Sequence, residues 1–131
     1  MNTRVLMRAS ALVQGALGVA ATFLPDELLA AMGAPAMPAL SVALQLLGAT
    51  CLGLAMLDWM VQGNLMGGIY GRPVVVCNLT HFTVGGLALL KRAASTRDAA
   101  TIGLAASYAI LAIGFGYVMR THPVRPADPV S

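Results

Sequence analysis

Apolar residues gather in four long stretches along the chain, and short polar segments separate them. The clearest stretch, Ala36–Leu57, holds 22 residues and no formal charge. An α-helix crosses a hydrocarbon core about 30 Å thick with roughly 20 apolar residues, since each residue adds about 1.5 Å. The pattern therefore predicts four transmembrane helices, over residues 5–24, 36–57, 74–90 and 99–119.

The composition agrees with a membrane protein. Hydrophobic residues make up 58% of the chain and charged residues 10%, against roughly 25% charged residues in soluble domains. Little chain remains outside the spans, so we expect a single all-α domain, an antiparallel four-helix transmembrane bundle, with a polar C-terminal tail over residues 120–131. The net charge of +3 is small and scattered. The lipid bilayer is therefore the expected partner, and nucleic acid is not.

A short amphipathic segment follows the first predicted span. Pro25 cannot easily continue a helix but suits the first turn of a new one, and the acidic Asp26 and Glu27 come directly after it. Gly33 is a helix-stopping residue. We predict a short interfacial helix over Pro25–Met32 that lies along the membrane surface.

The remaining connections carry most of the charges. Asp58 and Arg72 flank the longest connection, and we expect an ion pair between them that contributes at most about 1 kcal/mol at an exposed interface. Lys91–Asp98 is predicted to be a tight polar turn in which Ser95 or Thr96 caps the fourth helix.

Four crossings place both termini on one side of the membrane. That side holds five basic residues, and the opposite side holds three. The positive-inside rule then favours cytoplasmic termini. The five are Arg4, Arg8, Arg72, Arg120 and Arg125, and the three are Lys91, Arg92 and Arg97.

Each span carries small and polar residues at intervals of about four. Such residues mark helix contacts in a bilayer, where apolar side chains give no net drive for association. These predicted contact faces are Ser10, Gln14, Gly18 and Thr22; Ser41, Gln45, Ala49 and Gly53; Cys77, His81 and Gly85 with Asn78; and Gly103 and Ser107 with Tyr108. Ala11, Gly15 and Gly114 are left for contacts beyond the bundle.

Five polar side chains inside the spans are candidates for a polar core or a ligand site: Gln14, Gln45, Asn78, His81 and Tyr108. They are expected either to hold the helices together through hydrogen bonds or to line a cavity. A dry, packed interior favours the first role, and a hydrated cavity favours the second.

Among the Asp, Glu, His, Lys and Arg residues, His81 is the one expected well inside a span. Such a group is costly in lipid and is by default a functional candidate, although hydrogen bonds can satisfy a neutral imidazole. We predict that His81 points inward and has a hydrogen-bond partner on another helix, either Gln14 or a group on the fourth helix.

Motifs for catalysis, nucleotide binding and metal binding do not stand out. Cys51 and Cys77 lie inside predicted spans, where two buried thiols are favoured over a disulfide. No metal site and no cofactor are expected.

The chain resembles small bacterial four-helix membrane proteins of the DoxX-like kind. The likeness lies in the length, the four spans, and a first span that runs through Phe23-Leu24-Pro25 into an amphipathic turn ending at Gly33. The resemblance implies a multi-pass protein of the bacterial inner membrane, in the role of an accessory subunit.

These observations favour a non-catalytic structural or accessory protein that acts through helix–helix contacts, as a homo-oligomer or within a larger membrane complex. Two alternatives stay open. One is a small transporter or channel with a polar intramembrane pathway. The other is a membrane enzyme that acts on a lipid or quinone, with His81 as its acid or base.

Overall fold

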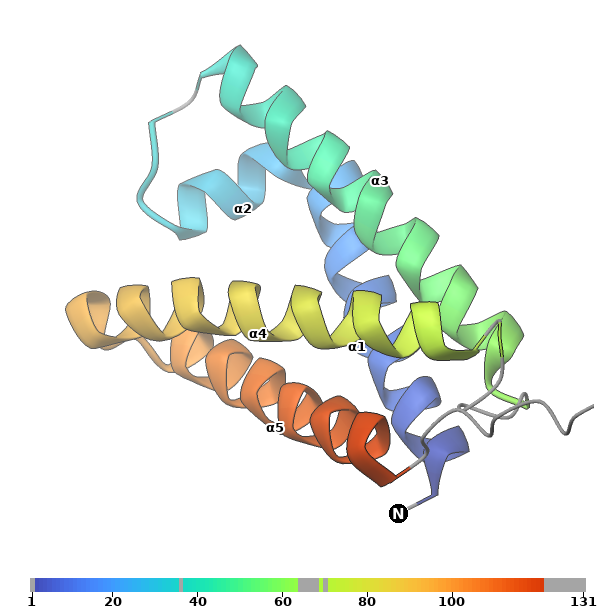
Figure 1. Ribbon diagram of the computed structural model, residues 1–131. Helices are drawn as coiled ribbons and strands as arrows, with labels where there is room; N and C mark the ends of the chain where they lie inside the picture. Colours follow the sequence, from blue (N-terminus) through green and yellow to red (C-terminus); the bar gives the residue numbers. More distant parts are fainter. Residues whose placement is uncertain (1, 36, 64–68, 70, 122–131) are drawn as a thin grey trace, which may run out of the picture. The chain divides into compact units, whose positions relative to one another are not determined.

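The computed structural model describes residues 2–35, 37–63, 69 and 71–121, and its regular elements are all α-helices (Figure 1). They are α1 (Thr3–Phe23), α2 (Pro25–Ala31), α3 (Pro38–Val61), α4 (Gly71–Thr96) and α5 (Ala99–Thr121). All but α2 are long and apolar enough to cross a membrane. The predicted four spans and the short helix after the first are therefore confirmed. Most of the expected tail lies outside the described residues, although Arg120 and Thr121 belong to α5.

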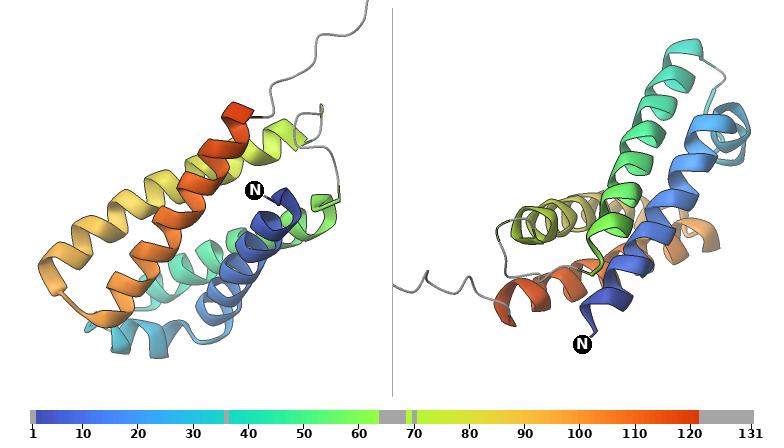
Figure 2. Two further views of the ribbon diagram at one scale, coloured as in Figure 1. Left: turned by 90° about the horizontal axis from the view of Figure 1, so that it is seen from below. Right: turned by 90° about the vertical axis from the view of Figure 1, so that its right-hand side faces the viewer.

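The chain divides into two compact units. The α1–α3 unit covers residues 7–62, and the α4–α5 unit covers residues 63–131 together with residues 1–6. Figure 2 shows α1 and α3 side by side in the first unit and the hairpin of α4 and α5 in the second.

Two glycines allow α1 and α3 to pack closely. A Cβ atom built on Gly48 would lie 2.7 Å from the backbone nitrogen of Thr22 and 2.9 Å from the carbonyl oxygen of Gly18. A Cβ on Gly18 would lie 2.9 Å from the carbonyl oxygen of Gly48. Real Cβ contacts essentially never fall below 3.0 Å. The backbones therefore meet at a distance that only glycine permits, as small residues allow between membrane helices.

Two residues expected to serve contacts beyond the bundle lie inside this unit instead. Ala11 is buried, and a Cβ on Gly15 would lie 3.7 Å from the Cβ of Ala55, on α3. Both residues therefore contact α3, and their expected role in contacts beyond the bundle stays a prediction. They share the side of α1 that α3 covers, since a residue three or four positions along a helix lies on nearly the same face.

The short helix α2 is attached to α3 at its start and ends in a glycine turn. The Ser41 hydroxyl donates to the Asp26 carboxylate at 2.5 Å, and Leu29 is buried. The Ala34 nitrogen donates to the Leu29 carbonyl at 2.9 Å while Gly33 has φ = 67°. This arrangement is a Schellman-type end, which requires a residue tolerant of positive φ. That α2 lies along the membrane surface stays a prediction.

Aromatic side chains form the core between α4 and α5. Phe82 and Phe115 are fully buried, and their rings stack with centroids 5.9 Å apart. The Tyr108 ring meets Phe82 edge to face, with centroids 5.0 Å apart. In the same unit, a Cβ on Gly114 would lie 2.7 Å from a Leu6 methyl carbon, so Gly114 is not left for outside contacts as predicted.

The connection between α4 and α5 is shorter than the sequence predicted. Helix α4 continues through Lys91 to Thr96, and Arg97 alone takes a left-handed conformation, with φ = 53°. Asp98 then caps α5, because its carboxylate accepts a hydrogen bond from the Thr101 nitrogen at 2.8 Å. The predicted caps were therefore wrong: Ser95 and Thr96 instead donate to the Arg92 carbonyl.

The predicted contact face of α3 was misplaced, and that of α4 was right only in part. On α3 the buried residues are Gly48, Cys51, Ala55 and Asp58, whereas Gln45, Ala49 and Gly53 are exposed. On α4 the buried line is Val74, Val75, Asn78, Phe82 and Gly86, and Cys77 is exposed. A strict spacing of four advances about 40° around a helix at each step, so it drifts away from a straight contact line. The buried line on α3 alternates steps of three and four, and the line on α4 mixes shorter steps with steps of four.

Candidate functional site

A buried chain of hydrogen bonds joins α1 to α3. The Gln14 side-chain nitrogen donates to the Ser10 oxygen at 3.0 Å, and the Ser10 hydroxyl donates to the Asp58 carboxylate. All three side chains are fully buried. Hydrogen bonds in such a chain polarise and strengthen one another in a medium of low dielectric. Ser10 and Gln14 lie one helical turn apart, which places both on the side of α1 that reaches Asp58.

Asp58 was expected at an exposed loop, and that prediction was wrong. Helix α3 continues beyond it to Val61, so the carboxyl group lies within a membrane-spanning helix. His81 is therefore not the one ionisable residue inside a span. Because Asp58 and Arg72 belong to different units, their ion pair stays a prediction.

Gln45, another candidate, lies away from this cluster. Its side chain is exposed, and its nitrogen makes one long contact, 3.4 Å, to the Thr22 carbonyl oxygen. It shares the exposed side of α3 with Ala49 and Gly53. We call these three residues the α3 stripe.

The second polar cluster lies between α4 and α5. A ring nitrogen of His81 lies 3.3 Å from the Tyr108 hydroxyl, so the prediction of a partner on the fourth spanning helix is confirmed. The His81 ring also meets the edge of Phe82, with centroids 5.2 Å apart. Gly85 makes room for this pair, since a Cβ there would lie 2.8 Å from the Tyr108 ring. The packing of the Tyr108 ring against Gly85 was not predicted, although two adjacent glycines, Gly85 and Gly86, indicate a close helix contact in the sequence.

Asn78 makes a hydrogen bond within its own helix. Its side chain is fully buried, and its nitrogen donates to the Val74 carbonyl at 3.1 Å. The bond follows the helix back by one turn, as polar side chains in membrane helices commonly do.

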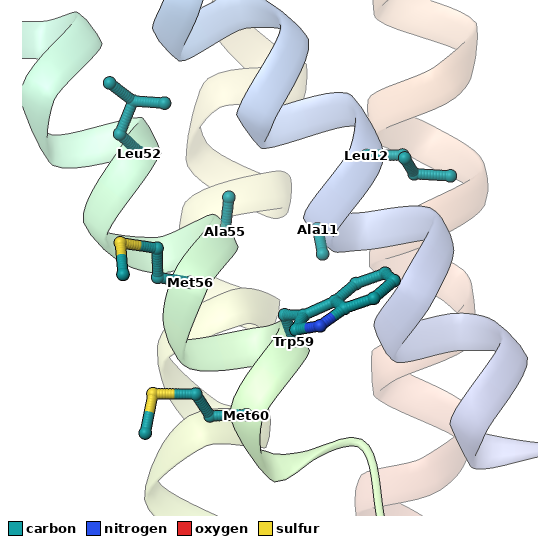
Figure 3. A pocket seen from close by; sticks show the side chains of 7 residues that line it. All are labelled: Ala11, Leu12, Leu52, Ala55, Met56, Trp59 and Met60. Carbon is teal, nitrogen blue, oxygen red and sulfur yellow. The ribbon is translucent and has the colours of Figure 1, made fainter.

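An apolar groove opens between α1 and α3, with a volume of about 270 Å³. Among the residues that line it, Ala11 and Ala55 lie between the two helices, and Leu12, Met56 and Met60 point outward on either side (Figure 3). Figure 3 shows the Trp59 ring reaching from α3 toward α1 beside Ala11.

One end of this groove carries a fixed cation. The Arg8 Nε donates to the Gln62 side-chain oxygen at 2.5 Å, and the Gln62 nitrogen donates to the Trp59 carbonyl at 2.7 Å. Arg8 precedes Leu12 by one helical turn, and Gln62 follows Trp59 by nearly one, so the pair sits where the groove ends. From the sequence, Arg8 was expected to matter only for the orientation of the chain in the membrane.

The groups of both polar clusters can form hydrogen bonds and exchange protons. No group of three or more His, Cys, Asp or Glu residues within the described part of the chain is placed to hold a metal ion. The Ser10 hydroxyl is directed at a carboxylate, and the His81 ring at a phenol.

These features define a small multi-span helical membrane protein that contacts the lipid bilayer. Comparison with protein-family models, with characterised proteins and with solved structures finds no match.

Proposed function

We propose that this protein is a non-catalytic accessory subunit of the bacterial inner membrane, of the DoxX-like kind, which acts by packing against a second copy or a larger complex. The observation that carries the proposal is the exposed α3 stripe of Gln45, Ala49 and Gly53. Only 11% of the spanning window of α3 is buried, the smallest share of the four spans. An exposed glutamine in a span is costly in lipid, and small residues beside it let another helix approach.

The polar clusters support the same conclusion. Ser10, Gln14 and Asp58 are buried and bonded in a chain, and His81 meets Tyr108. Such contacts hold helices together at about 0.6 kcal/mol each. The α3 stripe is therefore the surface available to a partner helix, while the buried polar groups hold the helices of the subunit together.

Cysteine crosslinking in native membranes tests the proposal. Cys51 and Cys77 are first replaced by alanine, and single cysteines are then introduced as Ala49→Cys or Gly53→Cys. Both variants are expected to form crosslinked dimers or a defined larger adduct.

Leu47→Cys is the matched control. Leu47 is 54% exposed and lies about 160° around the helix from Ala49. It is expected to crosslink far less. Equal crosslinking at positions 47, 49 and 53, or none at 49 and 53, would contradict a specific helix contact.

A second candidate function is proton-coupled transport through a polar pathway, and the buried Asp58 favours it. Intramembrane carboxyl groups mark proton relays and ion pathways. In vesicles with a potassium gradient and valinomycin, the wild-type protein would speed proton uptake, read by an internal pH dye, and Asp58→Asn would abolish the increase. Equal rates with and without the protein would exclude it.

A further inference from the structure

The groove between α1 and α3 has the shape of a site for a chain rather than for a helix. Its volume of about 270 Å³ lies below the 300–1,000 Å³ of ordinary ligand pockets, and a helix with side chains is about 10 Å across. Along α3 the lining runs from Leu52 to Met60, about 12 Å of helix. The flexible side chains of Met56 and Met60 adapt readily to an alkyl chain.

The charged end of the groove adds the second half of a lipid site. The Gln62 side-chain oxygen accepts a hydrogen bond from the Nε of Arg8, and the Gln62 side-chain nitrogen donates one to the Trp59 carbonyl. This bond leaves the outer edge of the guanidinium, with Nη1 and Nη2, to face a phosphate group. An arginine held in this way loses little freedom on binding, and its fork matches phosphate geometry.

The position of the cation fits this occupant. Trp59 is 55% exposed and lies in the last turn of α3, two residues before its end at Val61. Tryptophan prefers the level of the headgroups, where its ring is part apolar and part polar. A phosphate at Arg8 then leaves the acyl chain to run along the groove toward the bilayer interior.

We propose that this groove binds an anionic phospholipid, with one acyl chain between α1 and α3 and the phosphate on Arg8. The site depends on both parts, because the groove provides no charge and Arg8 provides no apolar surface for a chain. The charge of Arg8 provides the preference for an anionic headgroup. The hydrogen bond to Gln62 holds the Arg8 guanidinium in position.

Trp59 is the protein's one tryptophan, so its fluorescence reports on the groove directly. The protein is reconstituted in bilayers that contain phosphatidylglycerol or phosphatidylcholine with brominated acyl chains, at matched mole fractions. The brominated phosphatidylglycerol is expected to occupy the quenching site with about fivefold preference, the effect of one arginine near a charged membrane surface.

Three variants separate a built site from diffuse charge. Arg8→Gln is expected to reduce the preference to about one, while Arg92→Gln, which removes an exposed charge at the end of α4, leaves it unchanged. Gln62→Ala keeps the Arg8 charge but removes its anchor, and it is expected to lower the preference at least twofold. Helix content and elution volume are checked for each variant.

Equal quenching by the two lipids in the wild-type protein would overturn the proposal, as would a full preference in Arg8→Gln. A full preference in Gln62→Ala would show diffuse attraction and not a built site. Absence of quenching by either lipid, together with elution as a dimer, would place a second copy in the groove instead.

Discussion

Glycine at position 48 controls how closely α1 and α3 pack. A side chain there would meet the Thr22 hydroxyl and two backbone atoms, the Thr22 nitrogen and the Gly18 carbonyl oxygen, and backbone cannot rotate aside as a flexible side chain can. Gly53 on the same helix has nothing within 4 Å of a built Cβ. The two glycines differ in surroundings but not in chemistry, which makes them a matched pair.

Gly48→Ala is expected to destabilise the fold by about 1–3 kcal/mol, the usual cost of overpacking. Gly53→Ala is expected to leave stability unchanged or raise it by up to about 1 kcal/mol, because alanine favours helix. Unfolding by sodium dodecyl sulfate in mixed micelles, followed by circular dichroism, measures both. Equal effects of the two substitutions would show that the helices do not meet at Gly48.

The Ser10–Asp58 hydrogen bond is a buried link within the α1–α3 unit, and its acceptor is a carboxyl group. Ser10→Ala removes the donor and is expected to cost about 1–2 kcal/mol. A double-mutant cycle with Asp58→Asn isolates the pair in the same unfolding assay. A coupling energy of zero would mean that each side chain contributes independently.

At the scale of elements, the turn between α4 and α5 depends on one exposed carboxylate. Hydrogen bonds from the Thr96 side chain and from Thr101 lower the pKa of Asp98 from 3.8 to about 2. The folded state therefore favours the ionised form. This contribution to stability is present above the unfolded pKa of about 4, and it is lost as pH falls toward about 2.

Titration of the Asp98 carboxyl carbon by NMR is expected to give a midpoint near 2, and Thr96→Ala is expected to move it upward. Over the same range the Thr101 amide, which donates to Asp98, is expected to lose protection from hydrogen exchange. Asp98→Asn removes the titration, so its Thr101 protection should not change in that range. A midpoint at the ordinary value would show that the cap does not form.

Helix positions could be predicted from the sequence, because length and apolar content set them in a membrane protein. The short helix after Pro25 also followed from local rules for prolines and glycines. The contact faces of α3 and α4 could not be predicted in the same way. Apolar residues occur on every side of these helices, since lipid and helix neighbours accept the same side chains, and periodicity then gives little direction.

The candidate site was predictable only in part. His81 and a partner on the following span could be foreseen, since an imidazole in lipid needs a hydrogen bond. The burial of Asp58 could not, because its partner Ser10 lies 48 residues away in the chain and α3 continues past the charge. The hydrogen bond between Arg8 and Gln62 could not be predicted either, because the two residues lie 54 positions apart in the chain.

At the scale of the whole molecule, the number of crossings determines which segments share a side of the membrane. Four spanning helices place the start of α1 and the end of α5 on one side, and the Arg97–Asp98 turn on the other. The five basic residues counted on the side of the termini, against three on the other, favour cytoplasmic termini. That both termini lie on one side depends on the number of crossings, and that this side is the cytoplasm depends on the charges. One experiment can separate the two.

Asn2→Cys and Ser95→Cys, each with Cys51 and Cys77 replaced by alanine, are expressed in bacterial cells and treated with a membrane-impermeant maleimide. Ser95→Cys is expected to react in intact cells, because it lies beside the α4–α5 turn, and Asn2→Cys only after permeabilisation. The opposite pattern would keep four crossings and reverse the orientation. Reaction of both cysteines from the same side would mean that one of α1, α3 and α4, or all three, fails to complete the crossing that its length and composition predict.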